Sequence, residues 1–212
     1  GNTLTFFGPA VYNMTFEKFW LGNNNDKEEK EKYKGFIEFI NEQLKKISSS
    51  DPVNFYLGTH HNRLKYTIFS GILDTENKRH FANACCIKMS KKNGNWQIEF
   101  VFEGFPDKAD SNYFTNTGNP LTRGTEGIKD PQPLLDYLSG IKSENVNIYI
   151  MRHGNAFHNK PLKMASALDR PLDSCLTPLG IIQADKLGED LKKEGHLDSN
   201  GINVWCTSYM NR

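Results

Sequence analysis

The stretch that decides the fold covers residues 146–154 and reads Val146-Asn147-Ile148-Tyr149-Ile150-Met151-Arg152-His153-Gly154. Its first six residues are mostly apolar and rich in β-branched and aromatic side chains, so they predict a short buried strand. This strand ends directly before an arginine and a histidine. Because ligands of open α/β sheets bind outside the carboxyl ends of the strands, we expect Arg152 and His153 to lie at a binding crevice.

Four further strands are predicted around this stretch. Short runs of β-forming residues indicate buried strands at 53–58 and 202–207. Two more strands, at 84–89 and 96–102, are joined through Lys91-Lys92-Asn93-Gly94-Asn95, where Asn-Gly is a hairpin signal. We expect this hairpin to lie at one side of the sheet.

Four helices are predicted between the strands. Apolar residues at helical spacing indicate an amphipathic helix within 26–47, and shorter helices are expected at about 63–73 and 131–139. The fourth helix begins at Thr177-Pro178, with threonine as N-cap and proline at the first helical position, and ends at Gly195. Its predicted apolar stripe is formed by Leu179, Ile182, Leu187 and Leu191.

This alternation of strands and helices predicts the α/β class. The expected architecture is a three-layer α/β/α sandwich with a mainly parallel sheet covered on both faces. At 212 residues the chain is long enough for one large domain, so we expect a single domain over 1–212. Residues 104–130 are rich in glycine, proline, asparagine, aspartate and threonine, which is typical of a long surface loop or linker.

Composition argues against several classes of partner. The 26 lysine and arginine residues nearly balance the 25 aspartate and glutamate residues, so the overall charge favours neither nucleic acid nor an anionic membrane surface. The sequence contains no run of about 18 apolar residues and no signal-peptide pattern, which predicts a cytoplasmic protein. Its four cysteines have no metal-ligand spacing and predict buried thiols in a reduced protein.

Three of the predicted strands end at residues that are suited to bind an anion. The residues that follow these strands are Arg152 with His153, then His60, and finally Arg212. Two guanidinium groups and two imidazoles that converge on one crevice would form a phosphate pocket, because the planar guanidinium matches phosphate oxygens and keeps its charge.

Three motifs in the second half of the chain carry a family resemblance. Arg152-His153-Gly154, with Asn159 six positions beyond the histidine, resembles the signature of the histidine phosphatase superfamily, the phosphoglycerate mutase-like enzymes. The family's Leu-Thr-x-x-Gly-x-x-Gln-Ala helix start is similar to Leu176-Thr177-Pro178-Leu179-Gly180-Ile181-Ile182-Gln183-Ala184. Its Ser-x-x-x-Arg element resembles Cys206-Thr207-Ser208-Tyr209-Met210-Asn211-Arg212. Three motifs in the family's order make the resemblance specific.

A fourth match lies in the first half of the chain, although the family has this element near the C-terminal end. The stretch Phe55-Tyr56-Leu57-Gly58-Thr59-His60-His61-Asn62-Arg63-Leu64 resembles the segment with the second catalytic histidine, and the strands after it are similar to the family's closing hairpin. The two matching blocks, roughly 30–103 and 146–212, are therefore swapped. This implies a circular permutation in which 104–145 is a linker that bridges the original termini.

One feature of the second block departs from the family, whose members continue into a helix after the second arginine. Here that arginine is Arg212, at the end of the sequence. Two explanations stay open. Either further residues follow Arg212, or the segment 1–19 docks beside it and takes the place of the helix.

The resemblance implies a role for each site residue. His153 would attack the phosphorus atom and carry a phosphohistidine, which splits the transfer into two easier steps. The equatorial phosphate oxygens would be held by Arg152, Arg212, His60 and Asn159, as preorganised donors that stabilise the transition state.

The remaining implied roles concern the substrate and the leaving group. His61 would contact the substrate or support the residues that do. The family's general acid lies between the second arginine and the second histidine, and Glu17 is a candidate on position alone. The resemblance implies no metal and no cofactor.

The function expected from this resemblance is hydrolysis of a phosphomonoester through a phosphohistidine. The substrate would be a phosphorylated small molecule or a phosphoprotein. Two alternatives stay open: a mutase, which returns the phosphoryl group to another hydroxyl of the substrate, and a non-catalytic phosphate-binding or scaffold domain of the same fold.

Overall fold

The computed structural model describes residues 3–6, 29–47, 51–59, 81–105, 130–157, 174–197 and 201–206, together with Leu64. Only the backbone is described for 3–6 and 29–36. Most of the predicted helix at 63–73 and of the predicted loop at 104–130 therefore lies outside the described residues.

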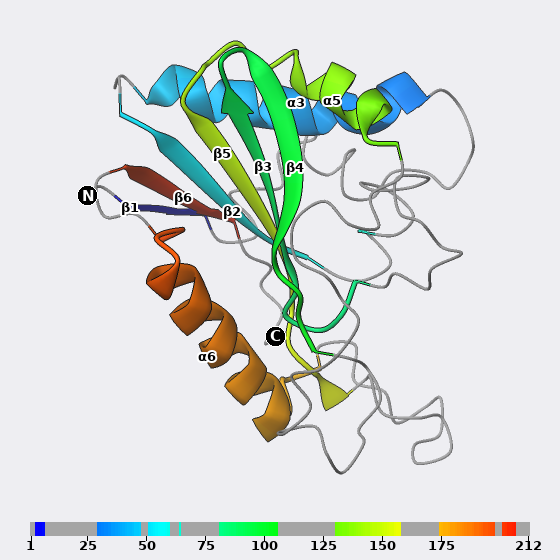
Figure 1. Cartoon of the computed structure of the whole chain (residues 1–212), viewed down its shortest axis with the longest axis vertical. Helices are drawn as coiled ribbons and strands as arrows, with labels where there is room; N and C mark the ends of the chain where they lie inside the picture. The colour runs from blue at the N-terminus through cyan, green and yellow to red at the C-terminus, as the bar shows by residue number, and fades with distance from the viewer. Residues whose placement is uncertain are drawn as a thin grey trace.

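The described strands form a single mixed sheet of six strands (Figure 1). In chain order these strands are β1 (Thr3–Phe6), β2 (Val53–Thr59), β3 (Cys86–Lys92), β4 (Asn95–Phe102), β5 (Val146–Arg152) and β6 (Ile202–Cys206). Their order in the sheet is β1-β6-β2-β5-β3-β4. The pairs β1·β6, β6·β2 and β2·β5 are parallel, whereas β5·β3 and β3·β4 are antiparallel. The predicted α/β class is confirmed, with a sheet that is mixed.

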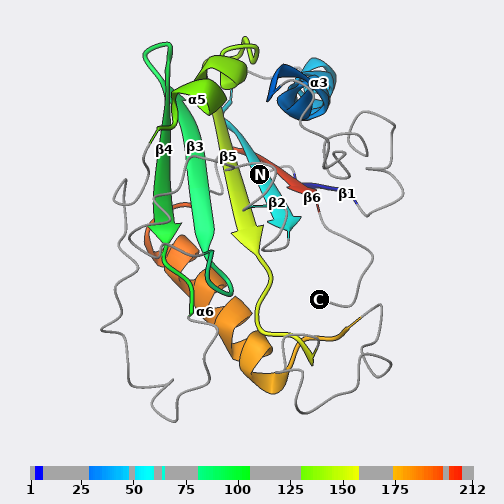
Figure 2. The ribbon, with the colours of Figure 1, turned by 90° about the vertical axis from the view of Figure 1, so that its right-hand side faces the viewer.

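Three described helices pack against this sheet. In Figure 1, α3 (Glu29–Lys46) and α5 (Gln132–Leu138) lie on one side of the strands, and α6 (Pro178–Lys193) lies on the other. Figure 2 gives the same arrangement from a perpendicular direction. The helices at 26–47 and 131–139 and the helix that begins at Thr177-Pro178 are thus confirmed.

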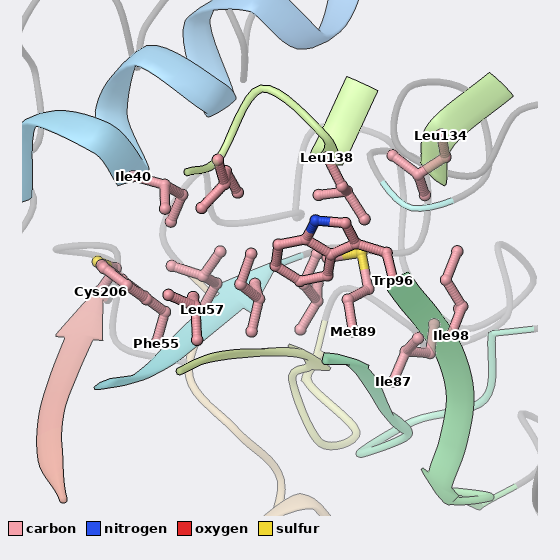
Figure 3. Close-up of a cluster of buried hydrophobic side chains, with 14 of the residues drawn as sticks. Ile40, Phe55, Leu57, Ile87, Met89, Trp96, Ile98, Leu134, Leu138 and Cys206 are labelled. Carbon is pink, nitrogen blue, oxygen red and sulfur yellow. The ribbon is translucent and has the colours of Figure 1, made fainter. Parts of the chain in front are cut away.

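The larger part of the core lies between the sheet and the helices α3 and α5. Side chains of a strand alternate between the two faces, so every second residue of a central strand points to the same core. Phe55 and Leu57 of β2 belong to this core with Ile40 of α3 and Leu138 of α5, and all four are buried (Figure 3).

The opposite face of the sheet packs against α6. The residues that intervene on the central strands, Tyr56 and Tyr149, belong to a second cluster with Leu187 and Leu191 of α6. Tyr56 also stacks on Trp205 of β6, with ring centroids 4.3 Å apart. The hydroxyl of Tyr56 donates to the carbonyl oxygen of His196 at 2.6 Å, which ties the C-terminal end of α6 to the sheet.

Local sequence signals predicted the turns and caps correctly. Asn93 and Gly94 both have positive φ, 51° and 78°, as the predicted Asn-Gly hairpin turn requires, and the hairpin β3–β4 forms one side of the sheet. At the end of α6, Gly195 has a φ of 75°, and the N–H of the next residue, His196, donates to the carbonyl oxygen of Leu191 at 2.8 Å. This is the hydrogen bond of a glycine-terminated helix.

Two predictions about side-chain burial are wrong. Ile182 does not belong to the apolar stripe of α6, because its side chain is 50% exposed, whereas Gln183 is fully buried. The inner face of the first turns of α6 is set by contact with a neighbouring loop and not by the core of the sheet. Cys85, Cys86 and Cys206 are buried as expected, but Cys175 is exposed.

The strand β1 lies in a segment for which no strand is predicted. It pairs in parallel with β6 along its whole length, from Thr3 opposite Asn203 to Phe6 opposite Cys206. This pairing places part of the N-terminal segment beside the strand that leads to residues 207–212. A four-residue edge strand depends on main-chain pairing with its neighbour, so the local pattern does not reveal it.

The last part of the predicted linker 104–145 packs against the sheet. Within it, α5 is followed by residues that return to β5. Three of its side chains, Leu134, Leu138 and Ile141, are buried in the core between the sheet and the helices α3 and α5.

Candidate functional site

The carboxyl ends of three neighbouring parallel strands meet at one edge of the sheet. β6, β2 and β5 are adjacent and parallel, so the residues that follow them leave the sheet at the same edge. Thr59, the last residue of β2, is paired with Arg152, the last residue of β5. The backbone N–H of His153 donates to the carbonyl oxygen of Thr59 at 3.2 Å. The two segments with the predicted catalytic histidines therefore start from paired residues.

The structure describes two of the predicted site residues, Arg152 and His153. The others, His60, His61, Asn159, Arg212 and the candidate acid Glu17, lie outside the described residues. Of these, His60 follows Thr59 directly in the chain.

Arg152 is a buried cation at this edge. Its side chain is only 4% exposed, and its Nη1 donates to the carbonyl oxygen of Phe81 at 2.6 Å. Its backbone N–H donates to the carbonyl oxygen of Cys85 at 3.0 Å. A charged group is costly to bury unless it is hydrogen-bonded, and the contact with Phe81 offsets part of this cost.

His153 has a defined ring orientation. Its Nδ1 lies 2.6 Å from the carbonyl oxygen of Gly154. A carbonyl oxygen only accepts hydrogen bonds, so Nδ1 carries the proton in this contact. In the neutral ring the lone pair is then on Nε2, which is the nitrogen left to act as a base, a nucleophile or a metal ligand.

A short segment before β3 wraps around Arg152 and His153. The N–H of Ala84 donates to the carbonyl oxygen of His153 at 3.1 Å, in addition to the two contacts of this segment with Arg152. Ala84 has a φ of 56°, a left-handed conformation that is costly for alanine and typical of functional sites when the surroundings impose it. The neighbouring side chain, Asn83, is fully buried, and within the described part of the chain its amide has no hydrogen-bond partner.

The local sequence pattern does not mark this segment as part of the site. Ala84 is the first residue of the predicted strand at 84–89, and Asn83 precedes that strand. A positive φ at alanine has no local sequence signal, because glycine and asparagine are the residues that normally adopt it. Only the hydrogen bond between the Ala84 N–H and the His153 carbonyl oxygen places this segment at the site.

The loop after His153 packs against the first turn of α6. A Cβ added to Gly154 would collide with the carbonyl group of Gly180, and a Cβ added to Gly180 would collide with the backbone of Asn155. The two glycines thus allow two backbones to touch. This contact explains why the helix start needs glycine at position 180, three residues after its N-cap.

Hydrogen bonds hold the same loop to α6 on both sides of Asn155. The N–H of Thr177 donates to the carbonyl oxygen of Asn155 at 2.9 Å, and its Oγ1 donates to the Oδ1 of Asn155, also at 2.9 Å. The Thr177 hydroxyl also accepts from the N–H of Gly180 at 3.0 Å, as the predicted N-cap should. On the other side, the N–H of Asn155 donates to the Oε1 of Gln183 at 2.7 Å.

The thiol of Cys86, near this edge, is in an environment that disfavours the thiolate. Cys86 pairs with Met151, the residue before Arg152. Burial, together with the neighbouring Cys85, raises the pKa of the Cys86 thiol well above its ordinary value. Nucleophilic cysteines need the thiolate, which this environment disfavours, so Cys86 is poorly suited to act as a nucleophile.

Neither metal binding nor a membrane span finds support among the described residues. They contain no group of three histidine, cysteine, aspartate or glutamate side chains that would hold a metal ion. In the same part of the chain no helix is long and apolar enough to cross a membrane.

Comparison with known proteins identifies no relative. No protein-family model, no curated protein and no solved structure matches the chain.

Proposed function

We propose that this chain is a histidine phosphatase that hydrolyses a phosphomonoester through a phosphohistidine at His153. The proposal includes the finer architecture that the resemblance implies: a three-layer α/β/α sandwich with a mainly parallel sheet, in a circularly permuted chain order. The substrate is a phosphorylated small molecule or a phosphoprotein.

The observation that carries this proposal is the hydrogen bond from Nδ1 of His153 to the carbonyl oxygen of Gly154 at 2.6 Å. A histidine that attacks phosphorus needs a lone pair on the attacking nitrogen. The bond keeps the ring proton on Nδ1, so Nε2 is the attacking atom. The position directly after β5, at the edge where β6, β2 and β5 end, supports the same role.

The proposed reaction has two steps. In the first, Nε2 of His153 forms a bond to phosphorus, the bond between phosphorus and the ester oxygen breaks, and a general acid protonates the leaving oxygen. In the second, water attacks the phosphohistidine and gives a proton to the conjugate base of the same acid, and inorganic phosphate leaves as the imidazole regains its lone pair. Glu17 is the proposed acid on its position in the chain.

The proposed phosphate contacts come from several strands. Arg152 and Arg212 supply positive charge to the equatorial oxygens, and His60 and Asn159 supply further donors. His61 contacts the substrate. The scheme uses no metal ion and no cofactor.

The strand order supports the permuted arrangement. β2 belongs to the block before the linker, and β5 and β6 belong to the block after it, yet β2 lies between them in one sheet. The blocks are therefore parts of one folded unit, in keeping with a single domain over 1–212 in which 104–145 joins the original ends.

The test is a p-nitrophenyl phosphate assay with wild type, His153→Ala and His153→Asn, combined with a measurement of acid-labile phosphate on the protein. We expect both variants to lose about 10⁴-fold or more of the activity and all of the acid-labile phosphate, because loss of a nucleophile has effects of this size. His196→Asn is the matched control, since His196 lies at the other end of α6 and should not affect turnover.

Two results would contradict the proposal. Activity that His153→Ala leaves unchanged would exclude this histidine as nucleophile. With a natural substrate, transfer of the phosphoryl group to another substrate hydroxyl without release of free phosphate would identify a mutase.

A further inference from the structure

The peptide group between Gly154 and Asn155 has both of its polar atoms engaged in the candidate site. Its carbonyl oxygen, that of Gly154, accepts a hydrogen bond from Nδ1 of His153 at 2.6 Å. Its N–H, that of Asn155, donates to the Oε1 of Gln183 at 2.7 Å. In a trans peptide the C=O and N–H lie in the peptide plane and point in opposite directions. His153 and Gln183 therefore bind at opposite edges of one rigid group.

Gln183 is well placed to fix the orientation of this plane. Its side chain is fully buried and lies on α6, within two turns of the N-cap Thr177. Thr177 holds the carbonyl oxygen and the side chain of Asn155, which prevents the loop from turning as a unit. The close contact of Gly180 with the Asn155 backbone adds a steric limit on the same side.

We propose that Gln183 is a positioning residue that keeps the ring proton of His153 on Nδ1, acting through the Gly154–Asn155 peptide group. This inference rests on the proposed function, for which Nε2 must be free of its proton. The neutral histidine side chain in water prefers the tautomer with the proton on Nε2, and that tautomer has no lone pair available at the attacking atom. The Gly154 carbonyl reverses this preference only while it faces Nδ1.

Hydrogen bonds in series reinforce this arrangement. When the Oε1 of Gln183 accepts from the peptide N–H, it polarises the peptide and makes the Gly154 carbonyl oxygen a stronger acceptor. At the other end of the series, the hydrogen bond from Nδ1 to the Gly154 carbonyl oxygen holds the His153 ring in one tautomer. A hydrogen bond made by one ring nitrogen is the usual way in which a histidine tautomer is set. Gln183 therefore acts on the nucleophile without touching the substrate.

The experiment measures the tautomer directly, by ¹⁵N NMR of the ring nitrogens in the full chain labelled at histidine, with His153→Asn used to assign the signals. Wild type should have Nδ1 protonated when the ring is neutral. Gln183→Leu, which removes the acceptor at similar volume, should shift the ring toward the Nε2-protonated tautomer. Single-turnover phosphorylation of His153 should fall about 10- to 100-fold, as when a catalytic group loses the partner that orients it.

Matched variants separate this effect from a loss of stability. Gln43 is another buried glutamine, on α3 at the opposite face of the sheet, so Gln43→Leu should destabilise the fold without changing the tautomer. Gln183→Glu keeps an acceptor at the same distance and should retain the wild-type tautomer. If Gln183→Leu fails to fold, Gln183→Asn withdraws the acceptor by one methylene and serves in its place.

The outcomes distinguish this inference from the proposed function. A folded Gln183→Leu variant with an unchanged His153 tautomer would overturn the positioning role, even if phosphatase activity were present. Wild-type His153 protonated on Nε2 would overturn it as well. A tautomer that shifts in Gln183→Leu supports the positioning role even if the phosphatase assay fails, because the NMR measurement does not depend on turnover.

Discussion

Gly180 and Gly188 lie on the same helix, α6, but have different surroundings. A Cβ at Gly180 would collide with the backbone of Asn155, whereas a Cβ at Gly188 would meet nothing within 4 Å. We expect Gly180→Ala to cost about 1–3 kcal/mol of unfolding free energy, because overpacking against backbone has no flexible side chain to move. Gly188→Ala should gain roughly 0.5–1 kcal/mol, because alanine is the better helix former.

Urea unfolding followed by circular dichroism measures both changes. The pair is matched because each variant makes the same chemical change in the same helix. If Gly180→Ala stabilises the protein as much as Gly188→Ala, the close backbone contact between α6 and the loop after His153 is not present in solution.

At the same scale, the sequence points to His153 and Arg152 as candidate site residues. It does not predict the hydrogen bond of the histidine ring or the burial of the arginine. The position after a strand and the Arg-His-Gly motif are local features, so they are visible in the chain itself. That Nδ1 bonds to Gly154, or that Arg152 is buried against Phe81, depends on where the backbone turns. The wrong assignment of Ile182 to the buried face has the same origin, because contact with the loop and not hydrophobicity decides which face of α6 turns inward.

Among the elements, β6, β2 and β5 are aligned by a row of asparagine side chains. The Nδ2 of Asn147 donates to the Oδ1 of Asn54 at 2.8 Å, and the Nδ2 of Asn54 donates to the Oδ1 of Asn203 at 3.1 Å. The three residues are opposite one another in the strand register. A shift of one residue in any strand would break this row, so it favours one register.

We expect Asn54→Ala to cost about 1–3 kcal/mol of unfolding free energy, because it removes the central member of the row and leaves two amides without that partner. A double-mutant cycle of Asn54→Ala with Asn147→Ala should give a coupling energy of roughly 0.5–3 kcal/mol, as for residues in one hydrogen-bond network. Equilibrium urea unfolding of the four proteins measures it.

Asn95→Ala is the control for the asparagine row. Asn95 is exposed at the start of β4, and its Nδ2 donates to the nearby carbonyl oxygen of Asn93 at 3.4 Å. Its replacement should change the unfolding free energy by less than about 0.5 kcal/mol. A coupling energy near zero between Asn54 and Asn147 would argue against the row as a register device.

At the scale of the whole molecule, a buried thiol lowers the free energy of unfolding as the pH becomes alkaline. Burial raises the pKa of Cys206 from its ordinary value of 9.0 to about 12. In this window the unfolded chain loses the thiol proton and the folded chain keeps it. The resulting contribution to stability is fully present below pH 9 and is lost as pH rises from 9 toward 12. One such group changes the unfolding free energy by about 1.4 kcal/mol per pH unit.

The test compares urea unfolding of wild type and Cys206→Ala at about pH 8 and about pH 10. The loss of unfolding free energy between these conditions should be roughly 1–1.5 kcal/mol smaller in the variant. Lys88 acts in the opposite direction, since burial lowers its pKa, but it is common to both proteins and cancels. Cys175→Ala, at an exposed thiol, should behave as wild type. Equal losses in wild type and Cys206→Ala would contradict the burial of this thiol.

The amino-acid sequence by itself determined the elements whose causes are local. The Asn93-Gly94 turn, the Thr177 cap and the Gly195 stop follow from backbone preferences of single residues, and the strands at 53, 146 and 202 begin at the predicted residues because β-forming side chains cluster there. The residues Arg152 and His153 belong to the same category, since they follow directly after such a strand.

Tertiary structure alone decided how these elements meet. Four contacts join residues that are far apart in the chain. They are the insertion of β2 between β6 and β5, the pairing of β1 with β6, the contact of Ala84 with His153, and the hydrogen bond of Gln183 with Asn155. Such contacts form when one segment satisfies the hydrogen bonds or fills the space of another, so neither segment carries the signal alone. The proposed control of the His153 tautomer depends on contacts of this kind, because Gln183 lies in a helix that returns to the loop after β5.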